Sequence, residues 1–314
     1  MREAEPLRSF LFVPAGRPDR VRKAATEYGA DAIIVDLEDA VPLAAKGEAR
    51  LVARDLLAEM AGVPARVFVR LNGWATGLLL LDAEAVAAPA LAGVFLAKAR
   101  DAADVAALDR VLFSLEATRE LPSGGIEIVP LPETAQGMRE VHAMCLASGR
   151  VRRTGVVDGA APGSDRLRSL GASWSPEGLE TLYASSRTVL DARAAGVDEV
   201  LCGPCLDLTN ADLLLSTAMR AKALGATASM AIHPRQVEVI NRVFTPTAGE
   251  IAQAVEVIEA FRASVARSPA VGVAVHRGRM IDYAHVRDAL RLLSRAGRSA
   301  ADVPALGPVE LPPE

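Results

Sequence analysis

Aromatic residues, cysteine and histidine are all scarce in this chain. Of its 314 residues, only 4% are aromatic, 3 are cysteine and 4 are histidine. Because 51% of the residues are nevertheless hydrophobic, we expect a folded protein whose core consists mainly of Ala, Val and Leu. Three cysteines are too few for a disulfide framework. A single close cysteine pair with so few histidines also argues against a zinc site.

The chain also lacks an excess of basic residues. It carries 35 Lys and Arg against 39 Asp and Glu, a net charge of −4, whereas nucleic-acid-binding proteins usually show a basic excess. We therefore expect no nucleic-acid partner. The small cluster of Arg150, Arg152 and Arg153 is interpreted as the solvated start of a strand. The length fits one large domain or two small ones.

No long hydrophobic run is present either. The most apolar stretch, residues 77–99, is interrupted by Asp82, Glu84 and Pro89, so it is too polar to cross a membrane. The first ten residues are charged and lack the apolar segment of a signal peptide. We expect a soluble cytoplasmic protein with no membrane partner.

The motif "CGPC" at residues 202–205 matches the thioredoxin-type redox pattern, in which a helix N-terminus lowers the pKa of a thiol. In thioredoxin-like folds this motif follows an early strand of a small domain, whereas here it comes late in a long chain. We therefore favour a buried cysteine followed by a turn at Gly203 and Pro204.

Short apolar runs alternate with segments long enough for a helix along most of the chain. The expected strands are residues 9–14, 32–37, 66–71, 93–98, 126–131, 153–158, 198–203 and 229–234. This alternation indicates a parallel sheet, and eight units ending near residue 244 predict an α/β fold, a (β/α)₈ TIM barrel. A doubly wound open sheet is the alternative. No G-x-G-x-x-G motif follows the first strand to support its dinucleotide-binding form.

End signals locate several helices. Pro18 opens a helix that stops at Gly29, and Ser175-Pro176 opens a long one that runs through Ala195. Beyond the barrel, the capping box "TAGE" at 247–250 starts a helix that reaches about residue 266. A strand over 270–275, the turn "HRGRMID" and a helix over about 284–295 follow.

Three regions follow from this pattern. Residues 1–245 form the barrel with the active site, and residues 246–296 form a C-terminal helical lid or oligomerisation segment. Residues 297–314 are a loose, Pro-rich tail.

Charged side chains follow nearly every expected strand. Active sites of such barrels form at the C-terminal ends of the strands, so these side chains should converge. In chain order they are Arg17, Asp36, Glu38, Asp39, Arg70, Lys98, Arg100, Glu133, Asp158, Asp165, His233 and Arg235, with the polar Asn72 and Cys202. Each has a structural explanation by itself, such as a helix cap or an ion pair. Their convergence favours a functional site.

The mixture of charges predicts a metal site with oxygen ligands. Glu133 and Asp165 are hard carboxylate ligands of the kind that holds Mg²⁺, with Mn²⁺ as the second candidate. Arg70 would lie opposite and offer a two-point grip on a substrate carboxylate or carbonyl.

The carboxylates after the second strand have a supporting role in this interpretation. Asp36, Glu38 and Asp39 would be neutralised by Arg17, Arg70 and the metal, because unpaired like charges in one place cost energy. Their task would be to orient the arginine and the water at the metal.

Five segments together resemble one family. They are "RSFLFVPAGRPDR", "ADAIIVDLEDAV", "VFVRLNG", "AIHPRQVEVINRVFTP" and "GRMIDYAHVRDALRLL". In this order, from about Arg8 to about Leu293, the chain resembles the β chain of citrate lyase and its stand-alone relatives in the HpcH/HpaI aldolase superfamily. The resemblance implies a TIM barrel of the phosphoenolpyruvate/pyruvate type that binds Mg²⁺ and keto acids. It also implies a lyase that splits or forms a β-hydroxyacyl-CoA, such as citryl-, malyl- or citramalyl-CoA, with an acyl-CoA and an α-keto acid as products.

The resemblance also implies roles for individual residues. "PETAQG" resembles the family's "IETARG", which gives Glu133 to the metal, and Asp165 falls where the second metal ligand lies. "VRLN" makes Arg70 the substrate arginine. "GRMID" gives Asp282 as an acid/base residue brought by a neighbouring subunit, which implies a homotrimer or homohexamer. Without the resemblance, we would assign Asp282 as the N-cap of the helix that follows.

The "HPRQ" motif lies near the place where relatives hold coenzyme A. The residues expected to bind substrate or the CoA thioester are Arg17, Lys98, His233, Pro234 and Arg235.

Three loops depart from the family pattern. This chain has "LAKAR" where the family often has "LPKVE", which puts Arg100 in place of an acidic residue. It has "PGSDRLRSLG" where the family has "GAEDLAADLG", which keeps Asp165 but adds Arg166 and Arg168. "CGPCLDLTN" replaces a loop closer to "DGVYTDFRD" and keeps Asp207. Because these changes surround the expected site, two alternatives stay open. One is a CoA-independent hydroxy-keto-acid aldolase, and the other is a non-catalytic subunit of a citrate lyase-like complex with partner chains.

Overall fold

The computed structural model describes residues 6–159, 161–268 and 272–298. These residues divide into two compact units at the boundary between Phe244 and Thr245. In the described part of the chain, no helix is both long and apolar enough to span a membrane.

The described part of the first unit contains a sheet of eight parallel strands. They are β1 (Ser9–Pro14), β2 (Ala32–Asp36), β3 (Arg66–Leu71), β4 (Leu91–Leu96), β5 (Glu127–Pro130), β6 (Arg153–Val157), β7 (Glu199–Cys202) and β8 (Ala228–Ala231). Their order is β5-β4-β3-β2-β1-β8-β7-β6, and Thr154 of β6 donates a hydrogen bond to the Pro130 carbonyl of β5 (3.1 Å). The sheet therefore forms a nearly closed barrel. The predicted (β/α)₈ fold is confirmed, with several strands shorter than expected.

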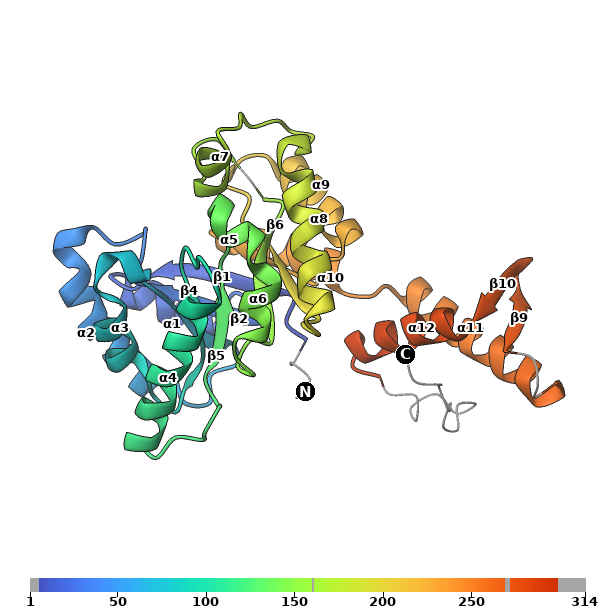
Figure 1. The fold of residues 1–314 in the computed structure, drawn as a ribbon, viewed down its shortest axis with the longest axis horizontal. Helices are drawn as coiled ribbons and strands as arrows, with labels where there is room; N and C mark the ends of the chain where they lie inside the picture. Colours follow the sequence, from blue (N-terminus) through green and yellow to red (C-terminus); the bar gives the residue numbers. More distant parts are fainter. Residues whose placement is uncertain (1–5, 160, 269–271, 299–314) are drawn as a thin grey trace. The chain divides into compact units, whose positions relative to one another are not determined.

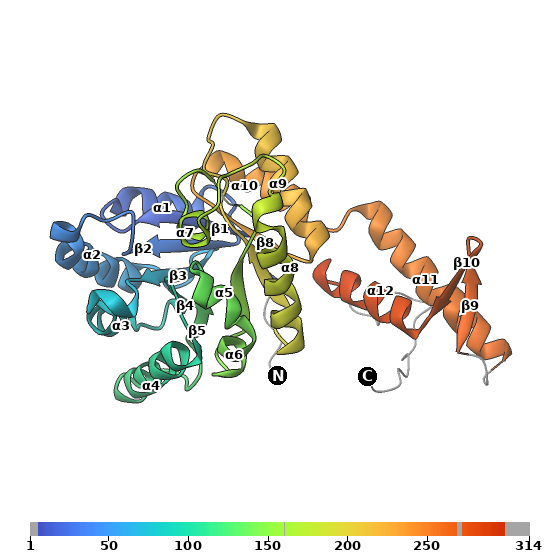
Figure 2. The ribbon, with the colours of Figure 1, turned by 45° about the horizontal axis from the view of Figure 1, so that its top comes forward.

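Helices cover the outside of this barrel (Figures 1 and 2). They are α1 (Pro18–Thr26), α2 (Lys46–Glu59), α3 (Leu79–Val86), α4 (Ala102–Thr118), α5 (Ala135–Arg139), α6 (Val141–Leu146), α7 (Asp165–Leu170), α8 (Leu179–Ala194), α9 (Ala211–Leu224) and α10 (Pro234–Phe244), with 3₁₀ turns η1 (Leu43–Ala45) and η2 (Trp74–Thr76). Alternate strand residues such as Ile33 and Val35 pack against helix residues such as Leu56 in one apolar cluster. This is the layering expected of a sheet that buries both faces.

One predicted helix start is wrong. The helix expected from Ser175 begins only at Leu179. The reason is local: Ser175 donates hydrogen bonds from its backbone N–H and its hydroxyl to the Glu180 carboxylate, at 3.1 and 2.6 Å. These bonds hold residues 175–178 in a turn that precedes the helix.

Three phenylalanine rings pack together in the apolar cluster inside the barrel. Phe10, Phe68 and Phe95 meet edge to face, with ring centroids 5.4–5.9 Å apart. Above them, toward the C-terminal strand ends, Phe12 lies 4.8 Å beneath the guanidinium of Arg70. A rigid aromatic layer thus forms the floor of the region in which the charged strand ends meet.

The arginine cluster at 150–153 is not the solvated strand start that we expected. Arg150 and Arg153 are 5% and 1% exposed. Arg150 donates to both carboxylate oxygens of Glu116 at 2.6 Å, and Arg153 donates to Glu127 at 2.8 Å. The prediction was wrong because a run of arginines does not reveal carboxylates that approach from distant elements.

The second unit has its own small core. It consists of α11 (Ala248–Arg267), β9 (Val273–His276), β10 (Arg279–Asp282) and α12 (Tyr283–Arg295), which bury Ile258, Phe261 and Ile281 among other residues. The predicted capping box of Thr247 and Glu250 is present.

The predicted turn "HRGRMID" is wrong, because its second half is strand β10. This strand pairs with β9 in an antiparallel hairpin. Of the predicted strand over 270–275, residues 270 and 271 lie outside the described residues, as does the predicted loose tail from residue 299 onward.

Candidate active site

Arg70 and Asp36 form the centre of the charged cluster. They are register partners on the neighbouring parallel strands β3 and β2, so their side chains emerge side by side at the mouth of the barrel. Arg70 Nε and Nη2 donate to the two oxygens of Asp36 at 2.7 and 2.6 Å. Both side chains are almost fully buried. Burial acts to lower the pKa of Arg70, but the carboxylates of Asp36 and Glu38 outweigh it and raise the pKa, so the guanidinium stays charged.

Lys98 crosses this cluster from the loop after β4. Its Nζ lies 2.5 Å from Glu38 Oε1 and 3.2 Å from Asp39 Oδ1, while Glu38 also contacts Arg70 Nη1 at 3.0 Å. Burial acts to lower the pKa of Lys98, but Glu38 and Asp39 outweigh it and raise the pKa. The backbone of Lys98 has φ of +52°, a left-handed conformation that a lysine rarely adopts. Such a conformation at the mouth of a barrel is typical of a functional loop.

Glu133 and Asp165 meet at the same lysine. The Lys98 backbone N–H donates to Glu133 Oε2 at 3.4 Å, and Lys98 Nζ lies 3.4 Å from Asp165 Oδ2. Burial raises the pKa of Glu133 to about 7; Arg70 and Lys98 act against this shift, while the charges of Glu38 and Asp165 add to it. Asp165 begins α7 and also pairs with Arg168.

This pair suits a hard cation such as Mg²⁺. Two carboxylates from different loops approach the same residue, Glu133 at the backbone N–H of Lys98 and Asp165 at its Nζ. Mg²⁺ is usually held by one or two carboxylates, with water and substrate oxygens completing its octahedron. Among the described residues, no three His, Cys, Asp or Glu side chains surround a single point as a ready ligand set. Because both donors are carboxylates, the pair fits Mg²⁺ better than zinc.

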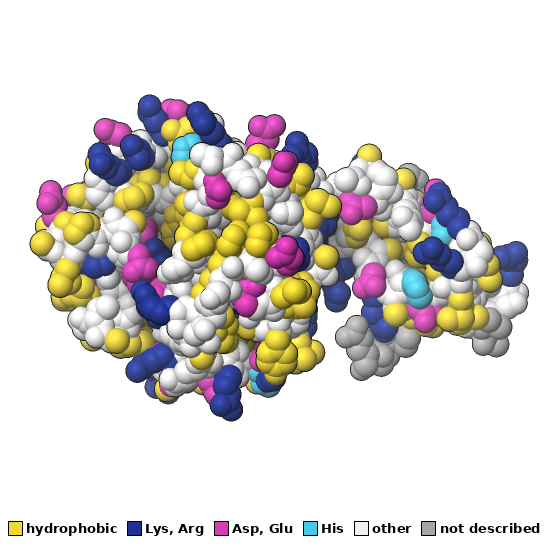
Figure 3. Space-filling view, turned by 90° about the horizontal axis from the view of Figure 1, so that it is seen from above, with side chains coloured by type: hydrophobic (Ala, Val, Ile, Leu, Met, Phe, Trp, Pro, Cys, Tyr) yellow, Lys and Arg dark blue, Asp and Glu magenta, His cyan; other side chains and the backbone are white. Residues whose placement is uncertain are grey.

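Of the residues expected to bind substrate or coenzyme, Lys98 lies in the charged cluster after β4, and the other four occupy two neighbouring strand ends. Arg17 follows β1, and His233, Pro234 and Arg235 follow β8, which pairs with β1. The side chains of Arg17 and Arg235 are exposed. In the space-filling view, acidic and basic side chains gather in a hollowed part of the first unit (Figure 3).

Two other strand-end residues are structural in their contacts. Asn72 is 1% exposed and donates to the Leu37 carbonyl and to Asp82. Arg100 is paired with Asp104 four residues later, at 2.8 Å. Neither joins the cluster around Arg70.

Asp158 lies apart from the Glu133 and Asp165 pair. It follows β6 and forms an ion pair with Arg220 of α9. The Asp158–Arg220 pair lines a cavity of about 330 Å³ that also contains Trp174. Neither Arg220 nor Trp174 is among the site residues expected from the sequence. The available signal was the rarity of tryptophan, since Trp174 is one of only two in the chain.

The cysteines are free thiols. Cys145, Cys202 and Cys205 are all buried and unbridged. Burial raises the pKa of Cys202 to about 12, the opposite of the shift that activates a redox thiol. The interpretation of the "CGPC" motif as a buried cysteine followed by a turn agrees with this environment.

Asp282 lies in the second unit, as the N-cap of α12. Its carboxylate accepts hydrogen bonds from the backbone N–H groups of Ala284 and His285 and contacts His285 Nδ1 at 2.7 Å. The hydrogen bond with His285 lowers the pKa of Asp282. The capping role is therefore present, and the acid/base role stays a prediction.

Known proteins resemble this chain over most of its length. The family model of the HpcH/HpaI aldolase/citrate lyase family matches residues 8–234. The chain belongs to this family. Citrate lyase subunit beta of Haemophilus influenzae is 31% identical over 289 residues, covering 92% of this chain and 96% of that protein.

Two further proteins similar to this chain have names that describe other activities or ligands. A (3S)-malyl-CoA thioesterase of Cereibacter sphaeroides is 31% identical over 95% of this chain and 98% of that protein. The structure of protein CitE from Mycobacterium tuberculosis, in complex with magnesium, acetoacetate and coenzyme A, is 30% identical. It has a TM-score of 0.70 and covers 95% of this chain and 100% of that one. The resemblance found in the sequence is confirmed.

Proposed function

We propose that this protein is a Mg²⁺-dependent carbon–carbon lyase. It cleaves a β-hydroxyacyl-CoA into an acyl-CoA and an α-keto acid, or forms it from these two compounds. The observation that carries the proposal is the cluster in which Lys98 joins Glu133 and Asp165 to the Arg70–Asp36 ion pair. Relatives named citrate lyase subunit beta and malyl-CoA thioesterase, and a related structure with magnesium and coenzyme A, support the substrate class.

The cleavage reaction is balanced without an oxidant or a reductant. The hydroxyl group of the substrate loses its proton, and the adjacent C–C bond breaks with its electron pair moving to the thioester fragment. That fragment then takes up a proton and leaves as acyl-CoA, while the other fragment is the keto acid. Mg²⁺ held by Glu133 and Asp165 would polarise the oxygens of the acid portion.

Arg70 has the geometry for the charge that develops on the thioester fragment. Asp36 fixes two of its N–H groups and the aromatic ring of Phe12 lies under it, so the guanidinium cannot turn freely. A cation held in this way stabilises developing negative charge without reorganising during the reaction. Lys98, bound to Glu38 and Asp39, adds a second fixed positive charge at the same mouth.

Asp282 is proposed as the group that gives or takes the proton at the thioester carbon. The hydrogen bond with His285 lowers its pKa further below neutrality, which favours the ionised form, and the side chain is only half-buried in its own unit. We propose that it acts on a neighbouring subunit of a homotrimer or homohexamer. Sedimentation velocity and a mixture of Asp282→Asn with Arg70→Gln subunits would test this, because shared sites regain activity in the mixture.

The compartment is part of the proposal. We propose a cytoplasmic enzyme, and support comes from the three free thiols, which suit a reducing compartment.

The first experiment is a binding titration with oxaloacetate, glyoxylate and pyruvate, with and without Mg²⁺. We expect one acid to bind only with Mg²⁺, and Glu133→Gln to abolish that binding. Glu238→Gln, on the exposed side of α10, is the matched control and should bind like the wild type. Failure of every acid to bind under both conditions would refute the proposal and direct attention to partner chains.

The second experiment separates a lyase from a thioesterase. Acetyl-CoA or propionyl-CoA is incubated with the bound acid, and the products are followed by mass spectrometry. A lyase forms the hydroxyacyl-CoA and retains the thioester, whereas a thioesterase releases free CoA. Release of free CoA without formation of the hydroxyacyl-CoA would replace the lyase assignment with a thioesterase assignment.

A further inference from the structure

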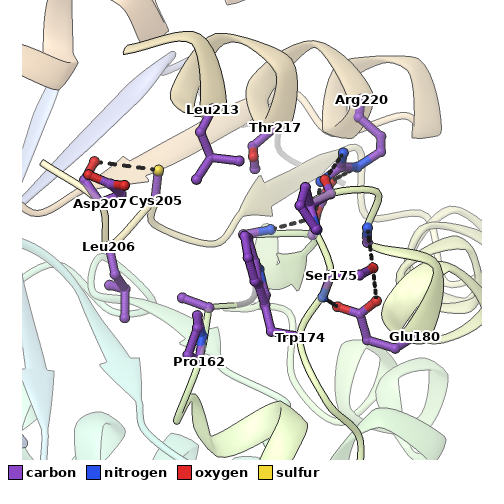
Figure 4. A pocket seen from close by; sticks show the side chains of 15 residues that line it. Pro162, Trp174, Ser175, Glu180, Cys205, Leu206, Asp207, Leu213, Thr217 and Arg220 are labelled. Carbon is purple, nitrogen blue, oxygen red and sulfur yellow. Dashed lines mark hydrogen bonds and ion pairs between the residues drawn. The ribbon is translucent and has the colours of Figure 1, made fainter. Parts of the chain in front are cut away.

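A cavity of about 330 Å³ lies beside the candidate active site, between the loops that follow β6 and β7 (Figure 4). Its walls are largely apolar, formed by Pro162, Trp174, Leu206 and Leu213. Figure 4 shows Trp174 projecting between Pro162 and the α9 residues Leu213 and Thr217. Two of the three loops that depart from the family pattern therefore enclose one apolar space.

The charged groups of this cavity are already paired. Arg220 is bound to Asp158 and donates to the Pro176 carbonyl at 3.1 Å. Glu180 accepts from Ser175 at 2.6 Å.

Asp207 at the cavity edge is also satisfied, since it accepts from the Thr209 hydroxyl at 2.7 Å. A charged ligand would have to break such pairs, which is costly in a partly dehydrated site. Thr217 also lines the cavity. The cavity therefore suits an uncharged apolar group with room for a single polar atom.

The cavity is close to the proposed reaction centre. Pro162 lines it, and Asp165 follows three residues later, so their Cα atoms are at most about 11 Å apart. Both the cavity and the Arg70 cluster lie at the C-terminal ends of barrel strands, where the substrate must enter.

We propose that this cavity binds the acyl side chain of the thioester substrate, which makes the preferred substrate an acyl-CoA longer or bulkier than acetyl-CoA. This inference rests on the proposed function. The keto acid and the CoA phosphates are anionic, whereas Arg220, the cation among the described residues that line the cavity, is already paired with Asp158. The pantetheine arm carries two amides, which the apolar walls cannot satisfy. An alkyl chain or aromatic ring needs no ion pair and no hydrogen bond, and its transfer from water into an apolar cavity lowers the free energy.

The test compares condensation rates of the wild type with acetyl-, propionyl-, hexanoyl- and phenylacetyl-CoA, using the keto acid that binds. Hexanoyl-CoA adds four CH₂ groups, so we expect kcat/KM at least about 10-fold above that for acetyl-CoA. Equal or lower values for the longer thioesters, with acetyl-CoA turned over normally, would overturn the inference and leave the proposed function intact.

Leu213→Trp fills the cavity from the partly exposed side of α9. It should remove the preference for hexanoyl-CoA, measured as the ratio of kcat/KM for hexanoyl-CoA to kcat/KM for acetyl-CoA. Met219→Trp is the matched control, because it adds the same ring at an exposed position of the same helix outside the cavity. The control should keep the preference. A preference that survives in Leu213→Trp places the acyl chain elsewhere and overturns the inference.

A binding measurement keeps the inference testable if no thioester is turned over. Trp174 lines the cavity and Trp74 does not, so tryptophan fluorescence in a Trp74→Phe background reports on the cavity. Hexanoyl-CoA should change this fluorescence and free CoA should not. No change with hexanoyl-CoA overturns the inference, whereas a change without turnover keeps the cavity and refutes the lyase reaction.

Discussion

Arg70 is held by Asp36 through two parallel hydrogen bonds, Nε to Oδ1 at 2.7 Å and Nη2 to Oδ2 at 2.6 Å. This leaves Nη1 and the second N–H of Nη2 for other partners, and Nη1 contacts Glu38 at 3.0 Å. Asp36 therefore fixes the orientation of the Arg70 guanidinium. The carboxylates at the end of β2 share one structural role. They hold two cations, Arg70 and Lys98, in place at the barrel mouth.

Asp36→Asn should lower kcat/KM far more than it alters the fold. The amide cannot hold both guanidinium nitrogens, and a reacting group displaced by about 1 Å costs about 100-fold in rate. Steady-state kinetics of the condensation reaction would measure this.

The matched control is Asp31→Asn. Asp31 lies just before the opposite end of β2 and binds Arg8 in the same two-point manner, at 2.8 and 2.7 Å. It should change stability without changing kcat/KM. Equal losses in both variants would show that Asp36 is only a structural ion pair.

Metal affinity should depend on pH through Glu133. Its pKa is raised to about 7 by burial, and a protonated carboxyl group does not bind Mg²⁺. The apparent Kd for Mg²⁺ should therefore fall about tenfold per unit as the pH rises toward 7, and should level off above it. Calorimetric Mg²⁺ titrations from about pH 5.5 to about 8.5 would show the break. A Kd that is constant across this range contradicts the placement of the metal on Glu133.

Glu116→Gln should destabilise the barrel while leaving the site chemistry unchanged. Glu116 is 1% exposed and is paired with the buried Arg150, and removing one partner of such a pair costs about 3–5 kcal/mol. Denaturant unfolding would measure the loss. Glu59→Gln breaks an exposed pair with Arg22 and should change stability little, which makes it the control.

The same pair sets a pH dependence of stability. Burial acts to raise the pKa of Glu116, but Arg150 and two backbone N–H groups outweigh it, so the folded pKa is below the ordinary value. The pair therefore contributes its full stabilisation above the pKa that Glu116 has in the unfolded chain. This contribution is lost as the pH falls through the lower pKa that Glu116 has in the folded protein. Wild type should lose more stability than Glu116→Gln on acidification. Parallel losses would contradict this assignment.

The cysteines should be inert in the folded protein. Burial raises the pKa values of Cys145 and Cys202 to about 12, so neither forms a thiolate at neutral pH. Alkylation by iodoacetamide at neutral pH should be slow in the native state and fast in denaturant. Rapid native alkylation of Cys202, or a disulfide to Cys205 after mild oxidation, would revive a redox role for the motif.

The sequence by itself determined the barrel and the composition of its mouth. Alternating apolar runs and helix signals repeat locally, so strands such as β1 and β3 were predicted with the bounds that they have. Because parallel strands of a barrel all end on one face, Asp36, Arg70 and Glu133 could be expected together before their distances were known. The family followed from five motifs in order, which is also local information.

Only the tertiary structure decided which charges pair. Asp36 meets Arg70 because β2 and β3 are in register, and Lys98 reaches four carboxylates because its loop adopts an unusual backbone conformation. Arg150 and Arg153 are buried because Glu116 and Glu127 approach from other elements, which no sequence window contains. The cavity beside Trp174 is likewise a property of three loops far apart in the chain. Local patterns specify elements, whereas charge pairs and cavities depend on distances between elements, and these are fixed only when the chain packs.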